Sequence, residues 1–177
     1  MVAGGFGIAW ALWGASGLTG GAAAAVRVAG VVIGALILLG SALLQRPARR
    51  SGSAAARRGG SDSLFIAPGY RLVVVWEVIA LVGGGALLRA TGHSEYTVAW
   101  FACVVGIHFV VFGRLFWVGF YWIGGALLAA GAAGAVVGFA GGDAGAIRAV
   151  AGLIAAASLF TAGGWTVLAA RASLRTR

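Results

Sequence analysis

The chain has 177 residues, of which 61% are hydrophobic and only 10% are charged, and its mean hydropathy is +1.00. Soluble domains carry about 45–50% apolar and about 25% charged residues, so this composition excludes a soluble globular domain. The net charge of +9 comes from arginine, because the chain contains no lysine. Five arginines crowd into one short polar stretch between apolar runs, at positions 46, 49, 50, 57 and 58. Such a basic loop is typical of the flank of membrane helices, and we expect no nucleic-acid partner.

Six apolar runs predict six transmembrane helices, because about 20 apolar residues in a helix span the hydrocarbon core of a bilayer. The runs are continuous and lack the strict alternation of barrel strands. They predict an all-α polytopic bundle that forms a single transmembrane domain over residues 1–177, with the lipid bilayer as its partner. The expected helices cover residues 2–20, 24–44, 70–89, 96–113, 117–139 and 145–170.

The arginines predict how these helices are oriented. Residues 45–67 are rich in Arg, Ser and Gly and lack a periodic apolar face, which predicts a cytoplasmic loop. With that loop in the cytoplasm and six spans, only Arg27, Arg89 and Arg148 lie on the opposite side, and ten arginines lie on the cytoplasmic side. This asymmetry follows the positive-inside rule and predicts cytoplasmic N- and C-termini in a bacterial inner membrane. No basic segment precedes the first run, which favours a retained helix over a cleaved signal peptide.

Glycines spaced four residues apart predict faces for close helix packing. Gly30 and Gly34 lie in the second run, and Gly134, Gly138 and Gly142 recur at the end of the fifth. Such small residues let the backbones of membrane helices approach each other, either within the chain or in an oligomer.

Two ionisable side chains, Glu77 and His108, lie well inside apolar runs. Glu77 follows Arg71 by six residues and His108 precedes Arg114 by six, so both side chains lie about 9 Å below the same interface at 1.5 Å per residue. The third and fourth helices are joined by a short turn and are expected to be antiparallel neighbours. The sequence therefore predicts a Glu77–His108 contact.

Two interpretations of this pair stay open. A carboxylate beside an imidazole can form a proton or ligand site with access from the cytoplasm. A buried polar pair can also serve only to fix the register of two helices. The membrane setting favours function more than a soluble core would, because an ionised side chain at a helix centre costs roughly 2.5–3.5 kcal/mol on insertion scales.

Four further residues could support such a site: Arg114, Tyr121, Trp76 and Trp100. Tyr121 belongs to an aromatic band next to Arg114, which is typical of the membrane–water interface. The alternative is a pocket for a cationic or aromatic ligand, formed by the band together with Trp76 and Trp100. The band consists of Trp117, Phe120, Tyr121 and Trp122.

Motifs for metal, nucleophilic or phosphate chemistry are missing from the sequence. The other histidine, His93, lies in the opposite turn beside Glu95, and no HExxH or CxxC spacing is present. Cys103 is the single cysteine and lies in an apolar run. We therefore predict neither an enzyme, nor a metal site, nor a cofactor.

The segment Val105-Gly-Ile-His-Phe109, followed by Gly113-Arg114-x-Phe116 and then by Tyr121 and Gly124, resembles a family of small bacterial multi-pass membrane proteins of unassigned activity. That family has the pattern V-G-L-H-F-x-P-L-A-R-x-F before Y-Y-x-x-G, and a glutamate in the preceding helix. The similarity covers roughly residues 70–125. It departs at Val111 and Gly119, where the family usually has proline. The resemblance implies a bacterial multi-pass membrane protein and marks Glu77, His108, Arg114 and Tyr121, but implies no activity.

These patterns lead to two functional hypotheses. The first is a proton-linked small transporter or permease centred on Glu77 and His108, which would need a homo-oligomer to line a pathway for an unidentified small molecule. The alternative is a structural or accessory membrane subunit that associates through its glycine-rich faces, with a purely structural Glu77–His108 pair.

Overall fold

The computed structural model describes residues 2–50 and 68–175. They form α1 (Val2–Ala15), α2 (Gly20–Arg50), α4 (Pro68–Ala90), the short 3-10 helix η1 (Ser94–Tyr96), α5 (Thr97–Leu115), α6 (Gly119–Phe139) and α7 (Ala144–Arg175). Five of these helices, all but α1 and η1, are long and apolar enough to cross a membrane. The predicted all-helical architecture of a multi-pass membrane protein is confirmed at this level.

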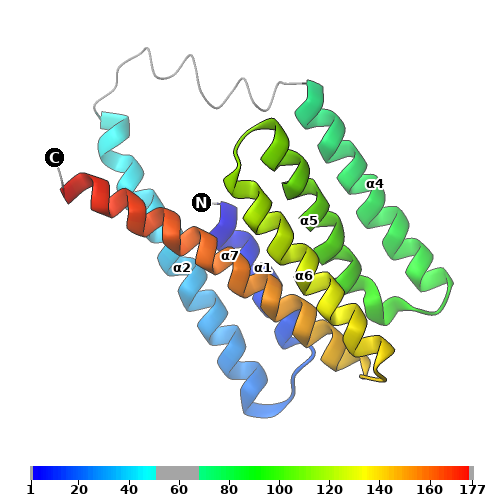
Figure 1. Cartoon of the computed structure of the whole chain (residues 1–177). Helices are drawn as coiled ribbons and strands as arrows, with labels where there is room; N and C mark the ends of the chain where they lie inside the picture. Colours follow the sequence, from blue (N-terminus) through cyan, green and yellow to red (C-terminus); the bar gives the residue numbers. More distant parts are fainter. Residues whose placement is uncertain (1, 51–67, 176–177) are drawn as a thin grey trace.

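The helices pack in a defined order across the bundle. Helix α7 packs against α1, α2 and α6, and α6 packs against α5. Helices α2 and α4 lie at opposite edges of the bundle (Figure 1). The turns after α1, α4 and α6 lie at one end of the bundle, whereas the α5–α6 turn and the start of α4 lie at the other. We call these the turn end and the α5–α6 end.

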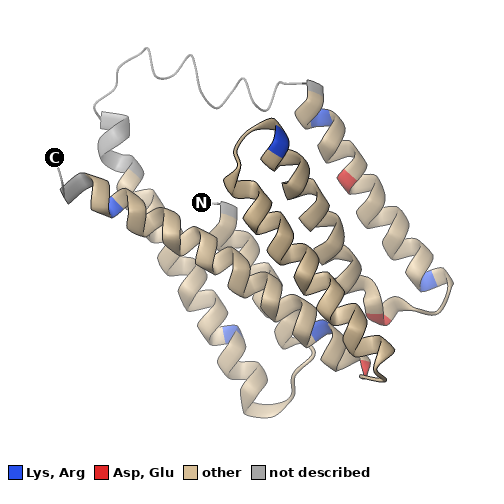
Figure 2. Cartoon of the chain, viewed as in Figure 1, with Lys and Arg blue, Asp and Glu red and all other residues tan. Residues whose placement is uncertain are grey.

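Charged residues gather at the two ends and leave the middle of most helices apolar (Figure 2). By their positions in the helices, Arg71, Arg114 and Arg171 lie toward the α5–α6 end, and Arg27, Arg89 and Arg148 lie toward the turn end. The carboxylates of Glu95 and Asp143 are also at the turn end. Glu77 departs from this distribution, because it lies within the apolar length of α4.

The core lies among α1, α5, α6 and α7 and is built mainly from small residues. Leu127, Ile147 and Val98 are the largest fully buried side chains, and they are surrounded by buried alanines. Because alanine has almost no side chain to order, helices packed through it approach closely at little entropic cost. In contrast, no residue of the membrane-spanning part of α4 is buried.

The first helix is shorter than expected. The sequence predicted a helix over residues 2–20, but α1 ends at Ala15 and its 14 residues extend about 21 Å, less than the roughly 30 Å hydrocarbon core. The Ser16 hydroxyl donates to the Trp13 carbonyl at 2.6 Å, and the amide of Gly17 donates to the Gly14 carbonyl at 3.0 Å. These short-range bonds replace the continuing helix. The predicted turn at Gly20–Gly21 therefore lies earlier, and Gly20 itself opens α2 with a φ of 61°.

The second helix is longer than expected, because residues 45–50 of the predicted cytoplasmic loop belong to α2. Gln45 and Arg46 have high helix propensity and extend α2, and the helix also continues through Pro47, a residue that is unfavourable inside helices. Arg46, Arg49 and Arg50 are therefore in a helix, whereas Arg57 and Arg58 lie outside the described residues. The other predicted helices match the observed ones closely, except that α7 continues to Arg175.

Candidate functional site

The two ionisable residues predicted to meet do so on the seam between α4 and α5. Nδ1 of His108 lies 3.0 Å from Oε2 of Glu77. The two side chains are only 10% and 19% exposed, in that order. The antiparallel α4–α5 hairpin places them at one depth because each is six residues from an arginine at the α5–α6 end.

The contact has the distance of an ion pair without the alignment of a hydrogen bond. Nδ1 of His108 is buried and has no hydrogen-bond partner among the described residues, so Oε2 approaches it off the axis of the ring N–H bond. The two side chains are therefore in direct contact without a hydrogen bond between them.

Two aromatic rings lie between the Glu77–His108 pair and the α5–α6 end of the bundle. The ring centroid of Phe112 lies 4.0 Å from that of the His108 imidazole, with an interplanar angle of 58°. Tyr70 stacks on Phe112 at 5.4 Å and 22°. We call Tyr70 and Phe112 the aromatic cap. The sequence analysis missed it, although its spacing was visible: Phe112 follows His108 by four residues and Tyr70 precedes Glu77 by seven, which puts each on the same helix face as its partner.

The four residues proposed to support the site lie in different parts of the structure. Arg114 is exposed at the last turn of α5, and the Tyr121 ring lies against Gly113. The Trp100 indole N–H donates to the Ala80 carbonyl at 3.0 Å and so links α5 to α4. Trp76 is 62% exposed and does not line the groove that Trp100 lines. The alternative of a common pocket for these tryptophans and the aromatic band finds no support, because Trp100 lies near the start of α5, at the turn end, whereas the band follows the end of α5.

Most of the predicted glycine faces are occupied within the chain. Gly30 lies against Ala11, and Gly34 lies against Ile8 and the Gly4 carbonyl. A Cβ at Gly134 would lie 2.8 Å from that of Ala151. These faces therefore pack α2 on α1 and α6 on α7, and they are not free for a partner.

The remaining two glycines of the predicted stripe pack differently from each other. Gly138 is covered by the Tyr96 ring, which belongs to η1 rather than to a neighbouring membrane helix. Gly142 lies beyond the end of α6, beside Val137 of its own turn, so it takes no part in helix packing. The predicted glycine stripe therefore extends beyond α6, because the helix ends at Phe139, before Gly142.

Metal-ligating side chains are scattered. Among the described residues, no three His, Cys, Asp or Glu side chains gather closely enough to hold a metal ion. The Nδ1 of His93 is directed at the Thr91 carbonyl at 2.8 Å, within the α4–η1 turn. The Glu77–His108 pair therefore has no third potential metal ligand beside it among these residues.

Comparison with known proteins adds no relative. No family model matches the chain, and no match was found among curated proteins or solved structures. The function is therefore inferred from the site itself.

Proposed function

We propose that the protein is a multi-pass protein of a bacterial inner membrane in which Glu77 and His108 form a proton-binding site linked to transport of a small molecule. The observation that carries this proposal is the 3.0 Å contact between a carboxylate and an imidazole within apolar helices. Support for the inner membrane and for cytoplasmic termini comes from the arginines: if α1 counts as a sixth span beside the five long helices, ten arginines fall on the cytoplasmic side and three on the other.

Proton binding changes the charge of the site. With an ionised Glu77 and a neutral His108, the pair carries a charge of −1, and one added proton brings it to zero. An ion in the apolar part of a bilayer is costly, so protonation makes the site easier to accommodate there. Loading and unloading one proton therefore alters the free energy of the α4–α5 seam, which is how a proton can be coupled to a conformational change.

The placement of α4 supports such a change. Among the described residues, helix α4 packs mainly on α5 and η1, and no residue in its membrane-spanning part is buried. It also contains Gly83, Gly84 and Gly85, which weaken a helix relative to alanine by about 1 kcal/mol each. Alternating access requires one element to move against a fixed remainder, and α4 is the helix with the fewest packing contacts to break.

Histidine NMR tests proton binding directly. The chain has two histidines, so His93→Gln leaves His108 as the single imidazole. In nanodiscs, the 15N spectrum of that variant should report whether the His108 ring nitrogens carry protons, and Glu77→Gln should change that spectrum at constant pH. A His108 spectrum that is the same with and without the Glu77 carboxylate would refute a shared proton site.

Proton flux into proteoliposomes tests the link to transport. A potassium diffusion potential should drive protons into the vesicles, and a pH-sensitive dye inside them measures the rate of entry. Glu77→Gln and His108→Asn should each lower that rate to the rate of empty vesicles. Glu95→Gln with His93→Asn is the matched control, because it removes a glutamate and a histidine from the α4–η1 turn. Equal rates for the Glu77 and His108 variants and the wild type would exclude transport through this site.

A further inference from the structure

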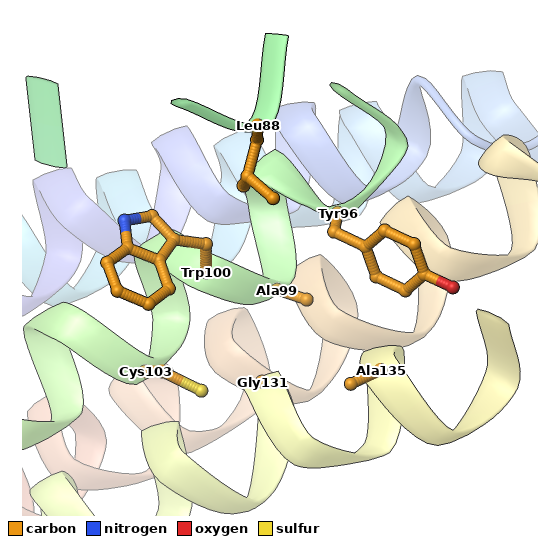
Figure 3. Close-up of a pocket in the computed structure, with 7 residues that line it drawn as sticks. All are labelled: Leu88, Tyr96, Ala99, Trp100, Cys103, Gly131 and Ala135. Atoms are coloured by element: carbon orange, nitrogen blue, oxygen red, sulfur yellow. The ribbon is translucent and has the colours of Figure 1, made fainter. Parts of the chain in front are cut away.

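A second feature of the fold is a groove between the last turns of α4 and the facing parts of α5 and α6. Its volume is about 160 Å³. Leu88 of α4 and the rings of Tyr96 and Trp100 form its walls, and the smaller residues lie beneath them (Figure 3). The floor consists of Ala99, Cys103, Gly131 and Ala135.

The lining of the groove is almost entirely apolar. The Trp100 indole N–H is already used on the Ala80 carbonyl, and the Tyr96 hydroxyl points away from Trp100. Apart from the Cys103 thiol, the other lining side chains offer no polar atom. An apolar surface that is open to the surroundings of the bundle is covered more favourably by hydrocarbon than by water. Hydrocarbon is therefore the chemistry that the groove accepts.

Small residues keep the groove open from below. Gly131 packs directly against the Cys103 sulfur. A Cβ atom added at Gly131 would lie 2.6 Å from the Ala99 carbonyl oxygen. This close approach of α5 and α6 makes a shallow floor, while α4 stands off from α6 and leaves the upper wall open. Trp100 is 39% exposed, so the groove opens to the surroundings of the bundle and not to its core.

The position of the groove selects its occupant. The lining runs from Tyr96 in η1, near the start of the membrane-spanning segment, to Cys103 in α5, about 10 Å deeper. At the shallow end, Arg89 follows Leu88 in the last turn of α4, is exposed, and makes no ion pair or hydrogen bond within the described residues. An arginine suits a phosphate, and the groove below it suits the first carbons of an acyl chain.

We propose that this groove binds one acyl chain of a bilayer phospholipid whose phosphate is held by Arg89. The lipid belongs to the leaflet at the turn end of the bundle. Its chain lies along Tyr96 and Trp100, and thereby fills the space between α4 and α6 that the side chains leave open. Glu95 in η1 directly precedes Tyr96, and this carboxylate favours a phospholipid with a zwitterionic head group over an anionic one.

A photoactivatable phosphatidylethanolamine with a diazirine in its acyl chain tests the groove. In reconstituted wild type, the α5 peptide that contains Trp100 and Cys103 should be labelled. Ala135→Phe fills the groove and should lower this labelling at least about fivefold, whereas Ala132→Phe, on the exposed face of α6, should leave it unchanged. Ala135→Val serves as a milder filling variant, expected to give an intermediate loss, if the phenylalanine variant does not fold.

Arg89→Gln tests the phosphate contact and should lower the same labelling about threefold. Labelling of α5 that Ala135→Phe and Ala135→Val do not reduce would overturn the acyl-chain site. Labelling that Arg89→Gln leaves at the wild-type level would overturn the assignment of the phosphate to Arg89. Recovery of an apolar molecule other than phospholipid in the groove, by mass spectrometry of the purified protein, would overturn the choice of occupant.

Discussion

The contact of α5 with α6 differs in kind from its contact with α4. Toward α6, the backbones approach so closely that a Cβ at Gly124 would lie 2.7 Å from the Gly106 carbonyl oxygen. Toward α4, a few specific side chains make the contact: the Glu77–His108 pair, the Trp100 hydrogen bond and the aromatic cap. Close packing through small residues is stiff and hard to reverse, whereas a contact made by a few polar groups can be broken and remade. The bundle therefore consists of a closely packed part, which includes α5 and α6, and of α4, which is attached to that part by a few side chains.

The largest expected effect comes from a methyl group placed where two backbones touch. Gly152 on α7 faces α1, and its ideal Cβ lies 2.5 Å from the Gly14 Cα. Because no flexible side chain can move aside, Gly152→Ala should lower the free energy of unfolding by about 2–3 kcal/mol. Gly164→Ala on the same helix, with nothing within 4 Å, should be neutral or slightly stabilising. Equal stabilities of the two variants by steric trapping in bicelles would contradict a fixed part built on close backbones.

A smaller effect is expected for the pair that attaches α4. A double-mutant cycle of Glu77→Gln and His108→Asn should give a coupling of about 1 kcal/mol, because polar contacts between membrane helices average about 0.6 and reach about 1.7 kcal/mol. The same unfolding measurement gives all four corners of the cycle. Additivity within about 0.3 kcal/mol would mean that the two side chains are neighbours without an interaction.

The smallest expected effect concerns the second polar link of α4. Trp100→Phe keeps a ring over Gly84 but removes the donor to the Ala80 carbonyl, and should cost about 0.5 kcal/mol, at the low end for a hydrogen bond. Hydrogen exchange should increase in α4 and remain unchanged in α6. Trp76→Phe is the matched control, because Trp76 is on α4 and largely exposed. Increased exchange throughout the bundle would show that α4 is not separately attached.

Much of this fold could be predicted because hydrophobicity alone determines where long membrane helices run. The segments that became α4, α5 and α6 were predicted within about two residues, and the depth of Glu77 and His108 followed from counting residues to the flanking arginines. The end of α1 could not be predicted, because it depends on local bonds of Ser16 and on the close passage of Gly17 past Gly145. A hydrophobicity pattern contains no information about that contact.

The candidate site was predicted less completely. Charge inside an apolar run marks Glu77 and His108 whatever their neighbours, so the sequence could single them out. The aromatic cap and the role of Trp100 depend on which faces of α4 and α5 meet, and many rotations of two helices are compatible with one apolar pattern. The glycine stripe was visible in the sequence, but only the packing of α6 on α5 and α7 decides that its face is covered.

The length of α7 has a consequence for the membrane around the protein. Its 32 residues extend about 48 Å, whereas the hydrocarbon core is about 30 Å thick. Beside it, α1 is shorter than that thickness. The uncharged stretch of α7 between Arg148 and Arg171 has 22 residues and extends about 33 Å, so it matches the hydrocarbon core, and the remaining turns of α7 reach beyond it. Only α1 is then too short, and thinning of the bilayer beside α1 should relieve that mismatch. Lipids with shorter acyl chains should therefore suit this face of the bundle better than longer ones.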